Sequence, residues 1–332
     1  PIDFSYELDI WGRVRKSFES ARAEAQASEA VFHTVLLAVT ADVARNYFTL
    51  RELEAEKEIL EKTVKLRQDS LNLVDQRFQS GLVSELDLTR AKTELATAQA
   101  DRIDIDRQRA EAENALAVLC GKPASEFSLT VVPLNIIPPF VPPGVPSVLL
   151  ERRPDIAEAE RLMASANATI GVAQAAFYPK VTLTGSAGLE SLELRNLTNW
   201  ESRAWSLGPN ISVPLFKGGK GKANLEAAQA KYDQTVANYR QTILIAFQEV
   251  EDSLARIQLG REQWEMQKKV MEAAQKTAQI SNDRYSQGLV NYLEVADAER
   301  ARLQSELKAI QILNRSLIST AQLIKALGGG WD

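Results

Sequence analysis

Cysteine and histidine are almost absent from this 332-residue sequence, which contains one of each, Cys120 and His33. A single cysteine excludes an intramolecular disulfide, and a single histidine leaves no cluster from which to build a zinc or copper site. The three methionines, Met163, Met266 and Met271, give no support to a dedicated copper or silver site. We therefore expect no bound metal and no cofactor.

An excess of basic charge and long apolar runs are also missing. The net charge is -5, which argues against a nucleic-acid partner because nucleic acid requires a basic surface. No stretch approaches 18 uninterrupted apolar residues, so the sequence predicts no transmembrane helix, and a membrane role would need β-strands. No nucleophile, acid–base pair, phosphate loop or metal cluster emerges, so we expect no enzymatic activity.

The sequence does contain an internal repeat. Residues 77–83 (RFQSGLV) return as residues 284–290 (RYSQGLV), an offset of 207. The same offset aligns further leucines, glycines and acidic residues without a gap, which indicates a tandem duplication. The counterpart of Pro1 is Gly208. We therefore expect roughly sixty residues of the first copy, and a leader before them, to lie outside this chain.

Each copy predicts a very long helix, a glycine turn and a shorter return helix. Residues 14–80 contain no proline or glycine, and strong helix formers dominate them at helical spacing. Gly81 interrupts this run, and the return helix is predicted over residues 84–119. The second copy repeats the pattern over residues 221–287 and 291–327. A further helix, residues 153–177, starts at a proline and ends before another.

Three segments, residues 4–10, 180–190 and 205–215, alternate apolar and polar side chains. Such strands form transmembrane barrels, and a soluble hairpin packed on the helices gives the same pattern. The lengths of the helices favour a tube. The long helix spans about 100 Å and the return helices together span about 91 Å, so the chain comes back to its starting height. A globular packing has no reason to match these lengths.

The predicted fold is therefore mainly α with a small β part. Long antiparallel helical hairpins form an α-barrel tunnel, and a β-hairpin contributes to a transmembrane β-barrel. The predicted parts are the end of a first β-hairpin (1–12), the helical hairpin of repeat 1 (13–122, tip at 81–83), a proline-rich equatorial linker (123–150), a helix (151–177), a barrel hairpin (178–217), the helical hairpin of repeat 2 (218–327, tip at 288–290) and a C-terminal equatorial end (328–332).

Several stretches resemble the TolC-type outer-membrane efflux factors, closest to the branch that serves resistance-nodulation-division pumps. They are residues 6–13 (YELDIWGR), 146–156 (PSVLLERRPDI), 176–179 (AFYP), both GLV turns and 326–331 (ALGGGW). The resemblance implies a homotrimer in the outer membrane of a Gram-negative bacterium, with four strands per protomer and a helical tunnel through the periplasm. The implied partners are outer-membrane lipid, a periplasmic adaptor protein and an inner-membrane resistance-nodulation-division pump. The implied function is a passive duct for drugs or other toxic small molecules, in a family whose mature N-terminus is often lipidated.

The resemblance also assigns roles at the two helix turns. The adaptor-docking residues are Gly81, Leu82, Val83, Gly288, Leu289 and Val290, although a glycine turn stapled by apolar residues also explains them. Asp87 and Tyr285 match partners in the network that closes the gate, so Asp87→Ala or Tyr285→Phe should raise ion leakage. The basic gate residue that the family places after the second glycine has no equivalent at Val290 or Asn291.

Glu294 and Asp297 are three residues apart on one helical face. In a trimer they would place carboxylates around the narrowest bore, as in cation-selective filters, and a solvated helix face would give the same pattern. A soluble periplasmic coiled-coil scaffold remains the second functional hypothesis. It explains the long helices, but neither the alternating segments nor the length match.

Overall fold

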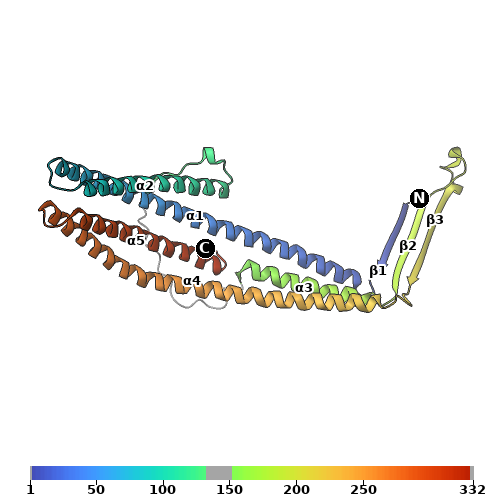
Figure 1. Ribbon diagram of the computed structural model, residues 1–332. Coiled ribbons are helices and arrows are strands. Elements are labelled where there is room, and N and C mark those ends of the chain that lie inside the picture. Colours follow the sequence, from blue (N-terminus) through green and yellow to red (C-terminus); the bar gives the residue numbers. More distant parts are fainter. Residues whose placement is uncertain (1, 132–151, 330–332) are drawn as a thin grey trace. The chain divides into compact units, whose positions relative to one another are not determined.

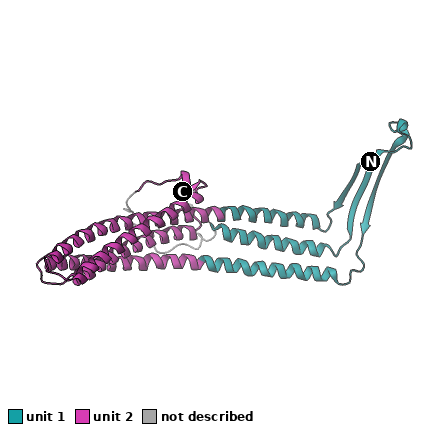
Figure 2. Ribbon diagram, turned by 45° about the horizontal axis from the view of Figure 1, so that its top comes forward, with its two compact units in different colours: residues 1–34, 150–246 teal, residues 35–149, 247–332 magenta. Residues whose placement is uncertain are grey.

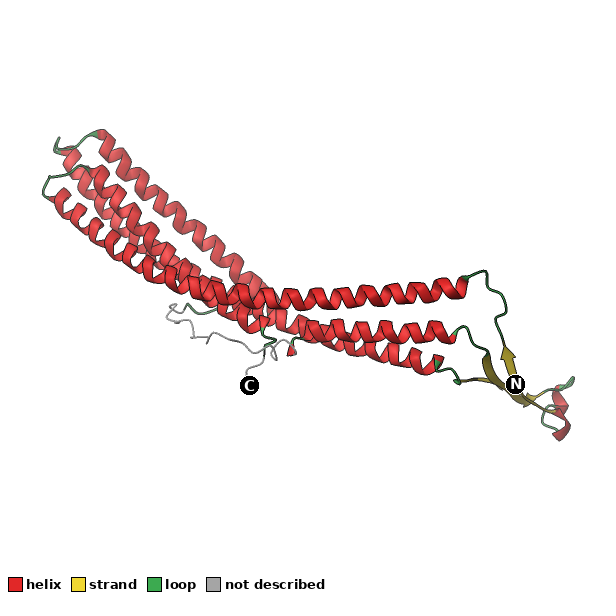
Figure 3. Cartoon of the chain, turned by 90° about the horizontal axis from the view of Figure 1, so that it is seen from below, coloured by secondary structure: helices red, strands yellow, loops and turns green. Residues whose placement is uncertain are grey.

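The computed structural model describes residues 2–131 and 152–329, which include five long helices and a small sheet (Figures 1 and 3). In chain order the elements are β1 (Ile2–Leu8), α1 (Arg13–Gln79), α2 (Glu85–Leu119), η1 (Ala124–Glu126), α3 (Pro154–Ala175), β2 (Lys180–Leu189), η3 (Leu194–Asn196), η4 (Trp200–Ser202), β3 (Arg203–Ser212), α4 (Lys220–Ser286) and α5 (Tyr292–Ala326). Most of the predicted linker (123–150) and of the C-terminal end (328–332) lies outside the described residues.

The duplication is exact at the level of the helices. Helices α1 and α4 each contain 67 residues, and α2 and α5 each contain 35. All four helix boundaries of the first copy return in the second at the offset of 207 that the repeat predicts. The predicted helical hairpins are confirmed.

The chain divides into two compact units, coloured separately in Figure 2. The first contains residues 1–34 and 150–246, and the second contains residues 35–149 and 247–332. The long helices α1 and α4 contribute residues to both units. The sheet belongs to the first unit, and both helix turns that the sequence singled out belong to the second.

The sheet of the first unit is antiparallel, with strand order β1-β2-β3. Strand β1 ends at Leu8, earlier than predicted. The reason is Asp9, whose carboxylate accepts hydrogen bonds from the backbone N–H groups of Val14 (2.8 Å) and Arg15 (3.0 Å) and so begins α1. Such a carboxylate satisfies N–H groups that have no partner within the helix.

Helix α3 is shorter at both ends than the predicted residues 153–177. Its C-terminal end is fixed by an aromatic contact in which Tyr178 stacks on Trp11, with ring centroids 4.6 Å apart. The Trp11 Nε1–H group donates a hydrogen bond of 2.9 Å to the carbonyl oxygen of Pro179. These contacts hold the start of β2 beside the residues that precede α1.

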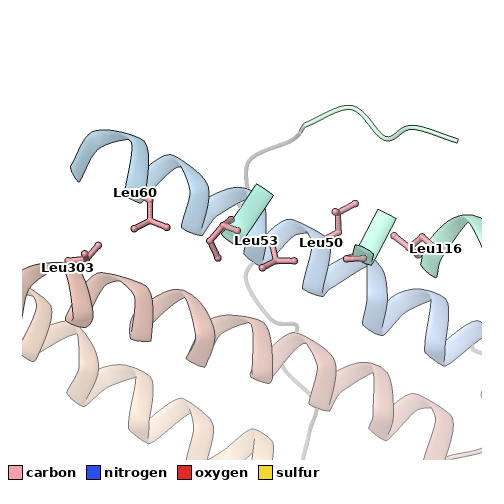
Figure 4. Packing of buried hydrophobic residues seen from close by; sticks show 7 residues of the cluster. Leu50, Leu53, Leu60, Leu116 and Leu303 are labelled. Carbon is pink, nitrogen blue, oxygen red and sulfur yellow. The ribbon is translucent and has the colours of Figure 1, made fainter. Parts of the chain in front are cut away.

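The second unit has an apolar core built mainly from leucines (Figure 4). Leu50, Leu53 and Leu60 come from α1, Leu116 comes from α2, and Leu303 comes from α5. Burial of each leucine side chain contributes about 1.5–3 kcal/mol. This core joins the hairpin of the first repeat to the return helix of the second.

Helix α1 also contains an 18-residue stretch of mean hydropathy 1.3, apolar enough by length and composition to cross a membrane. The sequence predicts no transmembrane helix because no uninterrupted apolar run is long enough; this stretch meets a criterion of length and mean composition only. Only 11% of that stretch is buried within the protomer, and exposed apolar residues recur on it, among them Phe32, Val35 and Leu36. A helix of 67 residues spans about 100 Å, far more than a bilayer requires.

Candidate functional site at the helix turns

The turns between α1 and α2 and between α4 and α5 have the same hydrogen bonds. Gly81 and Gly288 have φ angles of 72° and 75°, a region that glycine adopts without steric cost. In the first turn, the N–H of Gly81 donates to the carbonyl of Phe78 and that of Leu82 donates to Arg77, both at 2.9 Å. The second turn has the equivalent pair at 2.9 Å. This pair of bonds is the Schellman motif, which satisfies carbonyl groups at a helix end.

The two apolar residues of each turn have different surroundings. Leu82 is 74% exposed and Leu289 is 63% exposed. Val83 and Val290 instead pack against buried residues of the hairpin ends. The valines therefore stabilise the glycine turns, which is the structural role that the sequence analysis offered for these residues. The leucines remain available to a partner.

A cluster of seven buried residues, which we call the tip cluster, lies behind the turns. Helices α1, α2, α4 and α5 all contribute to it. Its members are Val74, Leu88, Ala91, Tyr285, Tyr292, Val295 and Ala296. The cluster therefore closes the two hairpins against each other within one protomer.

Two tyrosines form the aromatic part of the tip cluster. Tyr285 is 5% exposed and Tyr292 is 4% exposed, and their rings meet edge to face with centroids 5.8 Å apart. Burial is the main cause that raises the pKa of Tyr285 above its ordinary value. Burial, together with the nearby carboxylate of Glu94, raises the pKa of Tyr292 to about 12. Both rings therefore stay neutral at physiological pH.

Asp87 stabilises the start of α2. Its backbone N–H donates to the Ser84 hydroxyl at 3.3 Å, and that hydroxyl donates to Asp87 Oδ2 at 3.0 Å. The first bond caps the helix, with Ser84 as the N-cap residue, and the second holds the Ser84 hydroxyl in place. Asn291 caps α5 in the same way, accepting a 3.2 Å hydrogen bond from the N–H of Glu294. Asp87 and Glu294 therefore occupy equivalent positions in the two repeats.

The Asp87 carboxylate and the Tyr285 hydroxyl do not hydrogen-bond to each other in this protomer. The buried hydroxyl of Tyr285 has no hydrogen-bond partner among the described residues. The structure brings Tyr285 into the tip cluster but does not join it to Asp87 by a hydrogen bond within one protomer, and the gate role of both residues stays a prediction. Within the protomer, Tyr285 acts through its ring.

Glu294 and Asp297 are both exposed on α5. Asp297 pairs with Arg300 at 2.9 Å, and Arg300 also pairs with Glu94 of α2 at 2.6 Å. No ion pair of Glu294 occurs in the part of the chain that the structure describes. Glu294 is therefore the less neutralised of the two carboxylates.

Sequence reasoning missed the contacts that join the hairpins. Glu94 pairs with Arg300 of the second hairpin and also, within the first hairpin, with Arg67 of α1 at 2.6 Å. Arg77 stacks its guanidinium on the Tyr285 ring, 4.5 Å from the centroid. Arg77 lies in the repeated heptapeptide that identified the duplication, so its position was marked although its contact was not. No group of metal-ligating side chains occurs in residues 2–131 and 152–329.

Comparison with known proteins places this arrangement in one family. The outer membrane efflux protein family matches residues 2–122 and 145–329. The solvent efflux pump outer membrane protein SrpC of Pseudomonas putida is 38% identical over 329 residues, which are 99% of this chain and 70% of that protein. The cation efflux system protein CusC of Escherichia coli is 34% identical, over 100% of this chain and 72% of that protein.

A solved structure agrees with these sequence relatives. The outer-membrane channel OprN superposes with a TM-score of 0.94 at 31% identity, covering 99% of this chain and 74% of that one. The soluble scaffold considered from the sequence has no support among these relatives. The chain therefore belongs to the outer membrane efflux protein family and is a component of an outer-membrane efflux channel.

Proposed function

We propose that this protein is the passive exit duct of a tripartite pump for small toxic molecules and that it opens and closes at the two helix turns. The observation that carries the proposal is the tip cluster, which closes four helices around two buried tyrosines. Each turn is held by its own pair of backbone hydrogen bonds. The two hairpins can therefore move apart and together as whole units without unfolding either turn. The chain acts as a conduit and catalyses no reaction.

The proposed assembly is a homotrimer that meets outer-membrane lipid at its strands. The apolar side chains left uncovered on α1 support subunit contacts, because a contiguous exposed apolar face marks an interaction site. The proposed partners in the periplasm are an adaptor protein at the turns and an inner-membrane resistance-nodulation-division pump. The two exposed turn leucines are the residues best suited to contact the adaptor.

Charged substitutions at these leucines should weaken adaptor docking. The double variant Leu82→Asp/Leu289→Asp would place a carboxylate at each docking contact, where desolvation of an unpaired charge is costly. We expect its affinity for the adaptor to fall by about tenfold or more in a binding assay with the detergent-solubilised complete protein. The matched control is Val118→Asp, because Val118 is 73% exposed near the other end of α2. Equal affinity of the double variant and the wild type would refute docking at the turns.

We propose further that Glu294 and Asp297 line the bore and favour cations. Glu294→Gln should lower the cation-to-anion permeability ratio by roughly twofold or more. Asp297→Asn should change it less, because Arg300 already neutralises Asp297. Reversal potentials across planar bilayers under a salt gradient measure this ratio. Asp101→Asn, at an exposed position of α2, serves as the control, and an unchanged ratio in both α5 variants would assign these carboxylates to a solvated surface.

A further inference from the structure

We propose that Arg77 is the positioning residue that locks the closed tip, acting as a latch from the hairpin of the first repeat onto the hairpin of the second. The inference rests on the proposed gating at the helix turns. It concerns a side chain that makes no contact with the carboxylates considered for the gate.

The latch has three contacts. Arg77 lies in the last turn of α1. Its Nη1 group donates a 3.0 Å hydrogen bond to the carbonyl oxygen of Tyr285, and its Nη2 group donates a 3.0 Å hydrogen bond to that of Ser286. The centre of its guanidinium lies 4.5 Å from the centroid of the Tyr285 ring. One side chain therefore holds both the backbone and the buried aromatic ring of the opposite hairpin.

The accepting carbonyls explain why this position needs a cation. Tyr285 and Ser286 are the last residues of α4, where carbonyl groups have no α-helical donor four residues further on. The Tyr285 carbonyl accepts from the N–H of Gly288 and has a second lone pair for Arg77. The helix dipole adds partial negative charge at the same end. A guanidinium offers two parallel N–H donors and a flat face for the ring. An ammonium group would supply the charge without this geometry.

The duplication supplies an internal comparison. Arg284 occupies the same place in the second repeat, two residues before the end of α4. It is exposed, and within the described ranges it has no hydrogen bond or ion pair through its side chain. The two arginines occupy equivalent positions, but within the described part of one protomer Arg77 binds the other hairpin and Arg284 does not.

The chemistry of the latch also separates it from a carboxylate gate. Arg77 has no carboxylate partner among the described residues. A guanidinium group is always protonated in proteins, and backbone carbonyls do not titrate. Opening that results from loss of this latch should therefore be independent of pH between about 5 and 8.

The test compares Arg77→Gln, Arg77→Lys and Arg284→Gln in the complete protein. We expect Arg77→Gln to raise single-channel conductance about threefold or more, at pH 5 and pH 8 alike, and Arg77→Lys to give a smaller rise. Arg284→Gln should behave as the wild type. An equal rise in Arg77→Gln and Arg284→Gln, or a rise that is present at only one pH, would overturn the latch.

A second measurement does not depend on transport. Hydrogen exchange of the amides of Gly288 and Leu289, which bond to carbonyls at the end of α4, should become about fivefold faster or more in Arg77→Gln. Faster exchange with unchanged conductance would show that Arg77 stabilises the second turn but would refute gating at the turns. Unchanged exchange would refute the latch itself. The conservative Arg77→Lys variant provides the same readout if Arg77→Gln does not fold.

Discussion

Replacement of Tyr285 with alanine is expected to convert a closed channel into a leaking one, with single-channel conductance raised about fivefold or more. The ring is 5% exposed and contacts Tyr292 of α5 and Arg77 of α1. Its removal leaves a cavity in the tip cluster, and a buried aromatic ring replaced by alanine typically costs about 3–5 kcal/mol. Because the cluster contains only seven buried residues, we expect this loss to fall on the closed arrangement of the turns.

Tyr285→Phe is the matched control for that experiment. It keeps the ring and removes only a hydroxyl that has no hydrogen-bond partner among the described residues. Its conductance should therefore stay within about twofold of the wild type, which revises the expectation drawn from the sequence. Planar-bilayer recordings and uptake of a large antibiotic by cells both measure the leak. If Tyr285→Phe leaks as much as Tyr285→Ala, the hydroxyl has a partner outside the protomer and the ring is not the decisive element.

The helical architecture could be predicted from the sequence because its signals are local or repeated. Glycine at residues 81 and 288 marks each turn, since both φ angles are positive. The duplication then carries the boundaries of the first hairpin to the second. The predicted end of the first strand was less accurate. Asp9 accepts hydrogen bonds from N–H groups at the start of α1 and therefore does not continue the strand. Strand propensities alone do not show whether such a residue continues a strand or caps the next helix.

The contacts between hairpins could not be predicted, since they depend on which helices face each other. Arg77 and Tyr285 are separated by more than two hundred residues, yet their side chains stack. Nothing in the sequence near Glu94 shows that it bridges Arg67 and Arg300. The proposed gate carboxylate Asp87 was found through resemblance, and its observed role in the protomer is helix capping.

A second group that the sequence did not mark is Glu52 of α1, which faces α5. Its carboxylate accepts a hydrogen bond from Asn314 Nδ2, and the side-chain oxygen of the same asparagine is buried without a hydrogen-bond partner among the described residues. Burial and the neighbouring Glu56 raise the pKa of Glu52 to about 7, against the opposing effects of Asn314 and Arg315. Glu56 accepts a hydrogen bond from Gln311 and also has a raised pKa, chiefly through burial.

The raised pKa of Glu52 makes the stability of the folded protein depend on pH. The ordinary pKa is 4.5 and the folded value is about 7, so the folded state binds the proton more tightly. Stability is therefore highest below pH 4.5, as far as this group is concerned, and falls as the pH rises toward 7. The full difference corresponds to at most about 3 kcal/mol. Since the side chain is only partly buried, solvent screening reduces the expected effect to about 1–2 kcal/mol.

Glu52→Gln should accordingly stabilise the protein at about pH 8 and have a much smaller effect at about pH 5. The neutral amide cannot ionise, and it can donate to the unpaired oxygen of Asn314 while accepting from its amide nitrogen. We expect the melting temperature at the higher pH to rise by about 2–4 °C. Glu58→Gln is the control, because Glu58 is exposed on the same helix and pairs with Lys62. An equal rise in melting temperature at both pH values would show that Glu52→Gln improves packing without removing a buried charge. No rise at either pH would show that Glu52 is ionised and well solvated where α1 meets α5.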